Sequence, residues 1–141
     1  MKAEEKKIAV IGIGGVGGYV AGMLARAYPH VTMVARGARA ESIRDMVTED
    51  TVIIPVMNGV DPGENIRTLI GKGTVVDSLI YTVAFANEDF SISQQDTFTW
   101  LCIGIKNADE KQREKVAEVA KILKGADIDY KDEGDIEVEI W

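Results

Sequence analysis

The sequence is poor in the residues that build disulfide and zinc scaffolds. Among its 141 residues there is one cysteine, Cys102, and one histidine, His30. A single cysteine cannot form an internal disulfide, and one cysteine with one histidine falls short of the ligand set of a structural zinc site. A disulfide-stabilised domain and a zinc module are therefore both excluded, and no metal site is predicted.

Positive charge and long apolar runs are also scarce. Lys and Arg number 16 against 23 Asp and Glu, and the resulting net charge of −7 repels a phosphate backbone. No apolar stretch approaches the roughly 18 residues of a membrane-spanning helix, and the charged residues 1–7 are unlike a signal peptide. We expect a cytoplasmic protein that binds neither nucleic acid nor a membrane.

What the sequence does contain is enough apolar material, 46% of its residues, for the core of one domain. Short apolar runs typical of strands alternate with segments of helical periodicity. Strands are predicted over 7–12, 31–35, 51–57 and 74–84, and helices over 15–28, 39–47 and 62–71. This alternation predicts an α/β, Rossmann-like fold, a mostly parallel sheet with helices on both faces, in which the first strand is buried on both faces.

The last third of the chain departs from that alternation. Residues 90–93 and 97–105 flank a polar tripeptide, which predicts an antiparallel hairpin at the sheet edge. Residues 109–124 predict a helix that begins with acidic side chains and ends at Gly125. Its apolar face over 116–123 is either core or the contact of a homodimer, and the pattern favours core.

A glycine-rich segment of the G-x-G-x-x-G type lies between the first strand and the first helix. It consists of Gly12, Ile13, Gly14, Gly15, Val16 and Gly17. Gly12 permits a tight turn, Gly14 lets the backbone approach a pyrophosphate, and Gly17 lets the helix pack closely on the strand. The alternative is a glycine-rich turn without a ligand, but the strand before and the helix after favour a dinucleotide site.

Arg36 follows the second strand, 19 positions after Gly17 (36 − 17). This is the place of the residue that contacts the adenosine ribose. An arginine pairs with the 2′-phosphate of NADP by charge-assisted hydrogen bonds, and Arg39 adds a second candidate. The cofactor is therefore predicted to be NADP rather than NAD, unless Arg36 is merely a surface residue.

Asn58 and Gly59 follow the third strand, at the end where ligands bind in open α/β sheets. Asn-Gly is also a favourable turn, and the residues alone favour the turn. Ser78 has no histidine near it in the sequence, and Cys102 in an apolar strand is typical of an inert buried thiol. The sequence predicts no nucleophile with its base.

Together these segments resemble the ketopantoate reductase (2-dehydropantoate 2-reductase) family. The resemblance is carried by the glycine loop, Arg36, the Asn58-Gly59 pair and the acidic run 135–141 that ends in Trp141. It implies the NADP-binding domain of an oxidoreductase that reduces the ketone of 2-dehydropantoate with NADPH, in pantothenate and coenzyme A biosynthesis. It also implies that Asn58 lies near the nicotinamide and the substrate.

The sequence departs from this family in two places. Only 15 positions separate Arg36 from Thr51 (51 − 36), where the family has a further strand–helix–strand block, so we expect residues to be missing near 45–50, between Asp45 and Asp50. The family's catalytic lysine is expected just after Trp141. Residues 1–134 would then form the NADP-binding domain and 135–141 the start of a helix leading to a substrate domain, with no catalytic residue in this chain.

Two other functions fit the same residues. One is an NADP-dependent reductase of another small-molecule 2-oxo acid, since the substrate contacts lie outside the sequence. The other is a non-catalytic NADP-binding sensor module.

Overall fold

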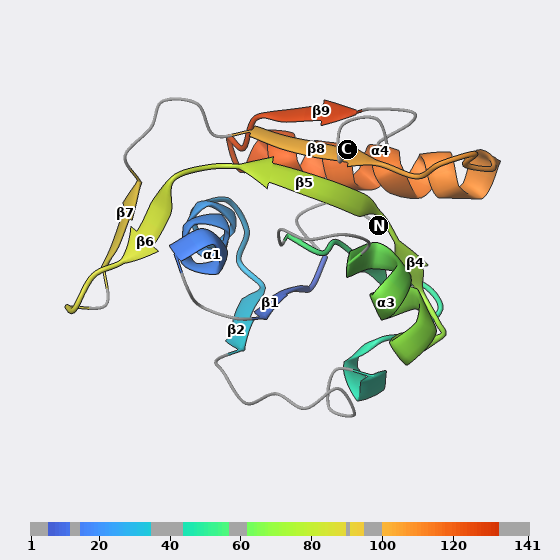
Figure 1. Ribbon diagram of the computed structural model, residues 1–141, viewed down its shortest axis with the longest axis horizontal. Helices are drawn as coiled ribbons and strands as arrows, with labels where there is room; N and C mark the ends of the chain where they lie inside the picture. Colours follow the sequence, from blue (N-terminus) through green and yellow to red (C-terminus); the bar gives the residue numbers. More distant parts are fainter. Residues whose placement is uncertain are drawn as a thin grey trace.

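The first unit of the fold is a parallel strand pair joined by a helix. The computed structural model describes residues 6–11, 15–34, 44–56, 62–89, 91–94 and 100–132. Strand β1 (Ile8–Ile11), helix α1 (Gly15–Ala27) and strand β2 (Val31–Val34) follow one another (Figure 1). The strands pair in parallel from Ile8 opposite Val31 to Ile11 opposite Val34, as the alternation predicts.

A second parallel unit consists of β3 (Val52–Ile53), α3 (Pro62–Ile70) and β4 (Thr74–Val75). A short helical segment over 44–46 and a turn closed from the Thr51 N–H to the Thr48 carbonyl lead into β3. Proline is favoured in the first turn of a helix because the N–H that it lacks has no partner there. Helix α3 accordingly begins at Pro62.

The third unit is a mixed sheet of β5 (Asp77–Tyr81), β8 (Trp100–Gly104) and β9 (Tyr130–Asp132). Strand β8 pairs antiparallel with β5 and parallel with β9, and helix α4 (Glu110–Gly125) connects β8 to β9. The Asp109 side chain caps α4 by accepting from the Gln112 N–H at 2.8 Å. These parallel and antiparallel units confirm the α/β class.

The antiparallel hairpin exists, but its strands are not the expected ones. Strand β6 (Ala84–Ala86) pairs with β7 (Ile92–Gln94), while β8 pairs with β5. The expected pairing of 90–93 with 97–105 is therefore wrong, and the expected strand 74–84 divides into β4, β5 and β6. The physical reason is a tight turn in which the Asn87 N–H donates to the Ser91 carbonyl at 2.8 Å.

The core is centred on the mixed sheet. Val76, Leu101, Cys102 and Ile103 are the largest fully buried side chains. The face of α4 that covers this sheet buries Val116, Val119, Ala120 and Leu123. The apolar face over 116–123 is therefore core, and Cys102 is a buried thiol as predicted.

The first strand is less buried than the sequence predicts. Ile8 and Val10 pack against the core, but Ala9 is exposed and Ile11 is 45% exposed. The prediction that this strand is buried on both faces is wrong, because only one of its faces meets the core. Among the helices that the structure describes, none has the length and apolar character needed to cross a bilayer.

Candidate functional site

The site is built at the carboxyl ends of β1 and β2. Ile11 pairs with Val34, so both parallel strands end at one edge of their sheet. The glycine loop begins directly after Ile11, and Arg36 comes two residues after Val34. The residues Gly12, Ile13, Gly14, Arg36 and Asn58 lie outside the described part of the chain, so their roles stay predictions.

The described part of the glycine segment forms the start of α1. Gly15, Val16 and Gly17 occupy its first turn, which contains no acidic residue. In contrast, Glu64 lies in the first turn of α3, and α4 has Glu110 in addition to its Asp109 cap. The first N–H groups of a helix and the positive end of its dipole attract anions. Helix α1 is thus the one of these three whose first turn bears no negative side chain to compete with a bound phosphate.

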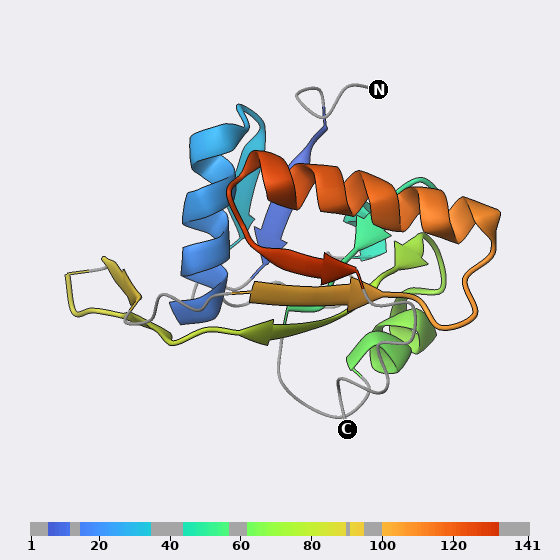
Figure 2. The same cartoon turned by 90° about the horizontal axis from the view of Figure 1, so that it is seen from above.

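The β6–β7 hairpin packs against the same helix end. A β-carbon built on Gly15 would stand 2.1 Å from the Ala84 carbonyl oxygen and 2.6 Å from the Phe85 α-carbon. Figures 1 and 2 both show the hairpin beside the first turn of α1. The motif assigns no packing role to Gly15, and the contact depends on a pairing that the sequence does not predict. Gly15 is required here for close approach between backbones.

The buried Ser78 of β5 holds the segment that precedes Asn58 in the sequence. The Ser78 hydroxyl donates to the Pro55 carbonyl at 2.5 Å, and Ser78 is 3% exposed. Val56 packs against the core. Strand β5 thereby holds the chain at Pro55, three positions before Asn58 in the sequence. The sequence alone gives no indication that Ser78 makes this contact.

An arginine joins α3 to β5. The Arg67 guanidinium donates to the Asp77 carboxylate at 2.7 Å and to the Val75 carbonyl at 3.2 Å, with Glu64 at 3.6 Å. These partners saturate one side of the guanidinium within the fold. Arg67 therefore orients α3 and is not a phosphate ligand.

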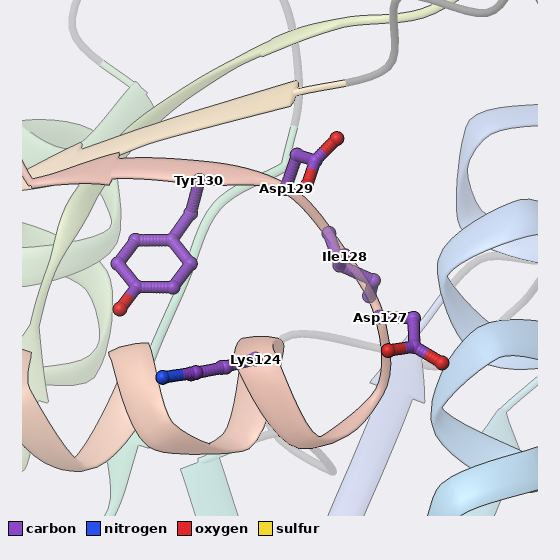
Figure 3. Close-up of a pocket in the computed structure, with 5 residues that line it drawn as sticks. All are labelled: Lys124, Asp127, Ile128, Asp129 and Tyr130. Atoms are coloured by element: carbon purple, nitrogen blue, oxygen red, sulfur yellow. The ribbon is translucent and has the colours of Figure 1, made fainter.

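A shallow depression between the end of α4 and the start of β9 is a separate feature (Figure 3). It is lined by Lys124, Asp127, Ile128, Asp129 and Tyr130. Lys124 and Tyr130 extend along one side, whereas the Asp127 and Asp129 carboxylates point away from them. The polar groups do not converge on a common point, so this depression is not the candidate site.

Solved structures with the same fold are reductases and dehydrogenases. The 2-dehydropantoate 2-reductase of Porphyromonas gingivalis is 23% identical with a TM-score of 0.74, over 95% of this chain and 66% of that one. The dimeric ketopantoate reductase of Staphylococcus aureus is 20% identical with a TM-score of 0.70, over 96% and 58%. A D-mandelate dehydrogenase in a ternary structure with NADH and anilino(oxo)acetate is 12% identical with a TM-score of 0.76, over 96% and 59%.

These alignments confirm the Rossmann-like fold, and the chain spans roughly three-fifths of the length of such proteins. No curated protein sequence matches it. The model of the family described as ketopantoate reductase PanE/ApbA matches residues 8–45 and 38–107, which is more than half of the chain. The chain belongs to the ketopantoate reductase PanE/ApbA family.

Proposed function

We propose that this chain is the NADP-binding domain of a reductase of 2-oxo acids, with 2-dehydropantoate as the substrate. The observation that carries the proposal is the register of β1 with β2. Because Ile11 stands opposite Val34, the glycine loop and the segment containing Arg36 start from one edge of the sheet. Ligands of open α/β sheets bind at this edge.

The described start of α1 suits the negative charge of a dinucleotide. Helix α1 presents a first turn without an acidic side chain, which suits a pyrophosphate held by Gly12, Ile13, Gly14, Gly15, Val16 and Gly17. Two residues span at most about 7 Å, so Arg36 stays within reach of a ribose beside the end of β2. Its guanidinium favours a 2′-phosphate and hence NADPH over NADH.

Bound NADPH would supply the hydride that reduces the ketone carbon. This chain's own residues bind and orient the dinucleotide, and Asn58 is proposed to face the nicotinamide and the substrate. The buried Ser78 supports this by anchoring the Pro55 carbonyl ahead of Asn58. The general acid for the keto oxygen is proposed to lie in the part of the longer relatives that this chain does not span.

The family match supports the proposed reaction. A place in pantothenate biosynthesis in the cytoplasm is part of the same proposal. The family match comes in two segments that overlap at 38–45, which supports our expectation that residues are missing near 45–50. A second candidate is a reductase of another 2-oxo acid. It is favoured by the likeness to a mandelate dehydrogenase, whose structure contains NADH and anilino(oxo)acetate.

Calorimetric titration of the 141-residue chain with NADPH and with NADH tests the cofactor proposal. We expect tighter binding of NADPH, and Arg36→Ala should remove about 10- to 100-fold of its affinity, the worth of one or two charge-assisted hydrogen bonds. Arg26→Ala is the matched control, because Arg26 lies in the last turn of α1. Equal affinity for both dinucleotides, or the same loss with Arg26→Ala, would refute the assignment of Arg36.

A further inference from the structure

Ser78 is the one polar residue that is buried among the residues that the structure describes. Most serines lie at protein surfaces. Ser78 instead stands in β5 opposite Ile103 of β8, and Ile80, the next residue on the same face of the strand, belongs to the core. Burying a hydroxyl costs free energy unless it forms a hydrogen bond. An apolar residue would fill this position without that cost, so the partner of the hydroxyl is what distinguishes the serine.

The Ser78 hydroxyl continues a series of hydrogen bonds that backbone groups begin. Three carbonyls at alternate positions, in β3 and beside it, each accept a hydrogen bond from the neighbouring segment 74–78. The pairs are the Thr74 N–H with the Thr51 carbonyl at 2.8 Å, the Val76 N–H with the Ile53 carbonyl at 2.9 Å, and the Ser78 hydroxyl with the Pro55 carbonyl at 2.5 Å. Strand β3 ends at Ile53. The side chain of Ser78 therefore extends the attachment two residues beyond the strand.

Pro55 lies where the chain leaves the carboxyl end of β3. Its ring restricts φ, and its carbonyl is held by Ser78, so both the direction and the position of the chain are fixed at this residue. Val56, the next residue, packs against the core. Three residues span at most about 11 Å, so Asn58 follows within a short reach of this anchor. A displacement of Pro55 would consequently be passed on to the segment that contains Asn58.

We propose that Ser78 is a positioning residue for the nicotinamide half of the bound dinucleotide. It acts through Pro55 on the segment that contains Asn58, and its own hydroxyl is directed to Pro55 rather than to a ligand. The inference rests on the proposed function, in which Asn58 faces the nicotinamide. The adenosine half is proposed to bind Arg36, which follows β2 and not β3. Loss of the Ser78 hydroxyl should therefore weaken the contacts to one half of the dinucleotide only.

Calorimetric titration of the full chain with NADPH and with 2′,5′-ADP separates the two halves, because 2′,5′-ADP carries the adenosine and its 2′-phosphate but no nicotinamide. Ser78→Ala should lower the affinity for NADPH about 3- to 10-fold, the worth of one hydrogen bond, and leave the affinity for 2′,5′-ADP unchanged. Arg36→Ala should weaken the binding of both ligands.

Further variants separate the hydroxyl from the stability of the core. Ser78→Cys keeps a side chain of similar shape with only a weak donor and should behave like Ser78→Ala, whereas Ser78→Thr retains a hydroxyl and should restore the binding of NADPH. Ile80→Val is the matched control, because it removes apolar volume from the same face of β5 and leaves the hydroxyl in place. It should change the affinity for neither ligand. Near-UV circular dichroism checks that each variant is folded.

The two ligands also distinguish failure of this inference from failure of the proposed function. Ser78 would be only a residue of the core if Ser78→Ala left NADPH binding unchanged, weakened both ligands equally, or had the same effect as Ile80→Val. NADPH binding by Ser78→Cys at full strength would overturn the inference as well. Each of these outcomes leaves the proposed function standing as long as binding depends on Arg36. If the unsubstituted chain binds neither ligand, the proposed function is refuted and this inference with it.

Discussion

The β1–α1–β2 unit differs in side-chain burial from the unit formed by β5, β8, β9 and α4. We call the second of these the α4 unit. In the α4 unit, Leu101, Cys102 and Ile103 are at most 1% exposed, and the helix adds a capping box. In the β1–α1–β2 unit, Ile11 at the end of β1 is 45% exposed. Helix α1 buries Val20, Ala21 and Leu24, so the difference lies in β1 and not in its helix. The candidate site follows the exposed end of β1.

The difference in burial separates the part of the fold that contributes most of the stability from the part that carries the candidate binding site. Burial of an apolar side chain stabilises by about 1.5–3 kcal/mol, so the α4 unit contributes most of the hydrophobic free energy. Gly15 and Gly17 at the start of α1 have no side chain and so add no buried apolar side-chain area. A unit of low local stability is where ligand-binding loops are commonly found.

The largest expected effect compares the two units directly. Leu101→Ala leaves a cavity in the middle of the core and should lower the free energy of unfolding by about 2–5 kcal/mol. Ile11→Ala, in half-exposed β1, should cost about 1 kcal/mol or less. Urea denaturation followed by circular dichroism measures both. Equal losses of unfolding free energy in the two variants would mean that β1 is as well packed as β8, which would contradict the difference in burial.

A pair of glycines in α1 sharpens the comparison at the site. Gly15→Ala forces a β-carbon against the Ala84 carbonyl and should destabilise by about 1–3 kcal/mol. Gly22→Ala, in the same helix with no atom within 4 Å of its added carbon, should stabilise by about 0.5–1 kcal/mol. Thermal unfolding of both variants shows whether each substitution raises or lowers the stability. If Gly15→Ala also stabilises, the hairpin does not pack on the start of α1.

A buried hydrogen bond links the α4 unit to the segment before Asn58. Ser78→Ala removes the donor to the Pro55 carbonyl and should cost about 1–3 kcal/mol, because the carbonyl is left without this partner. Ser93→Ala is the control, since Ser93 accepts from Asn87 in a partly buried contact on the hairpin and should cost less. A cost no greater than that of the control would show that Ser78 does not hold this segment.

The helices could be predicted closely from the sequence because their ends carry local signals. Pro62 and Asp109 mark the starts of α3 and α4, and Pro29 limits α1. Helix α3 is expected over 62–71 and spans Pro62–Ile70, so it ends one residue earlier. Helix α4 is expected over 109–124 and spans Glu110–Gly125, so it begins and ends one residue later. Capping and helix-breaking act within one turn, so one sequence suffices to see them.

Strand pairing and the surroundings of the site could not be predicted in the same way. The pairing of β8 with β5 depends on which distant apolar strand completes the core, and the tight turn at Asn87 decides the partner of β6. The contact of Gly15 with Ala84 follows from that pairing. The glycine motif predicts the start of a helix, which α1 confirms, whereas the hairpin beside it is a tertiary feature without a local signal.

The smallest expected effect tests an ion pair that ties the start of β1 to α4. Burial raises the pKa of Glu118, but the hydrogen bond and charge of Lys6 at 3.2 Å, with Lys115, outweigh it and hold the pKa below its ordinary value of 4.5. A lowered carboxyl pKa in the folded state stabilises above the unfolded value and ceases to do so as pH falls through the folded value. Because the Glu118 side chain is 40% exposed, solvent screening limits this to about 0.5 kcal/mol or less.

Glu118→Gln should therefore reduce stability slightly at pH 7 and converge with the unsubstituted chain below the folded pKa of Glu118, as measured by urea midpoints across pH. Glu114→Gln, on the exposed side of the same helix, is the matched control. If the two variants show the same pH profile, Lys6 does not couple β1 to α4 through Glu118. The two units would then be joined by their shared core, without an electrostatic link at the start of β1.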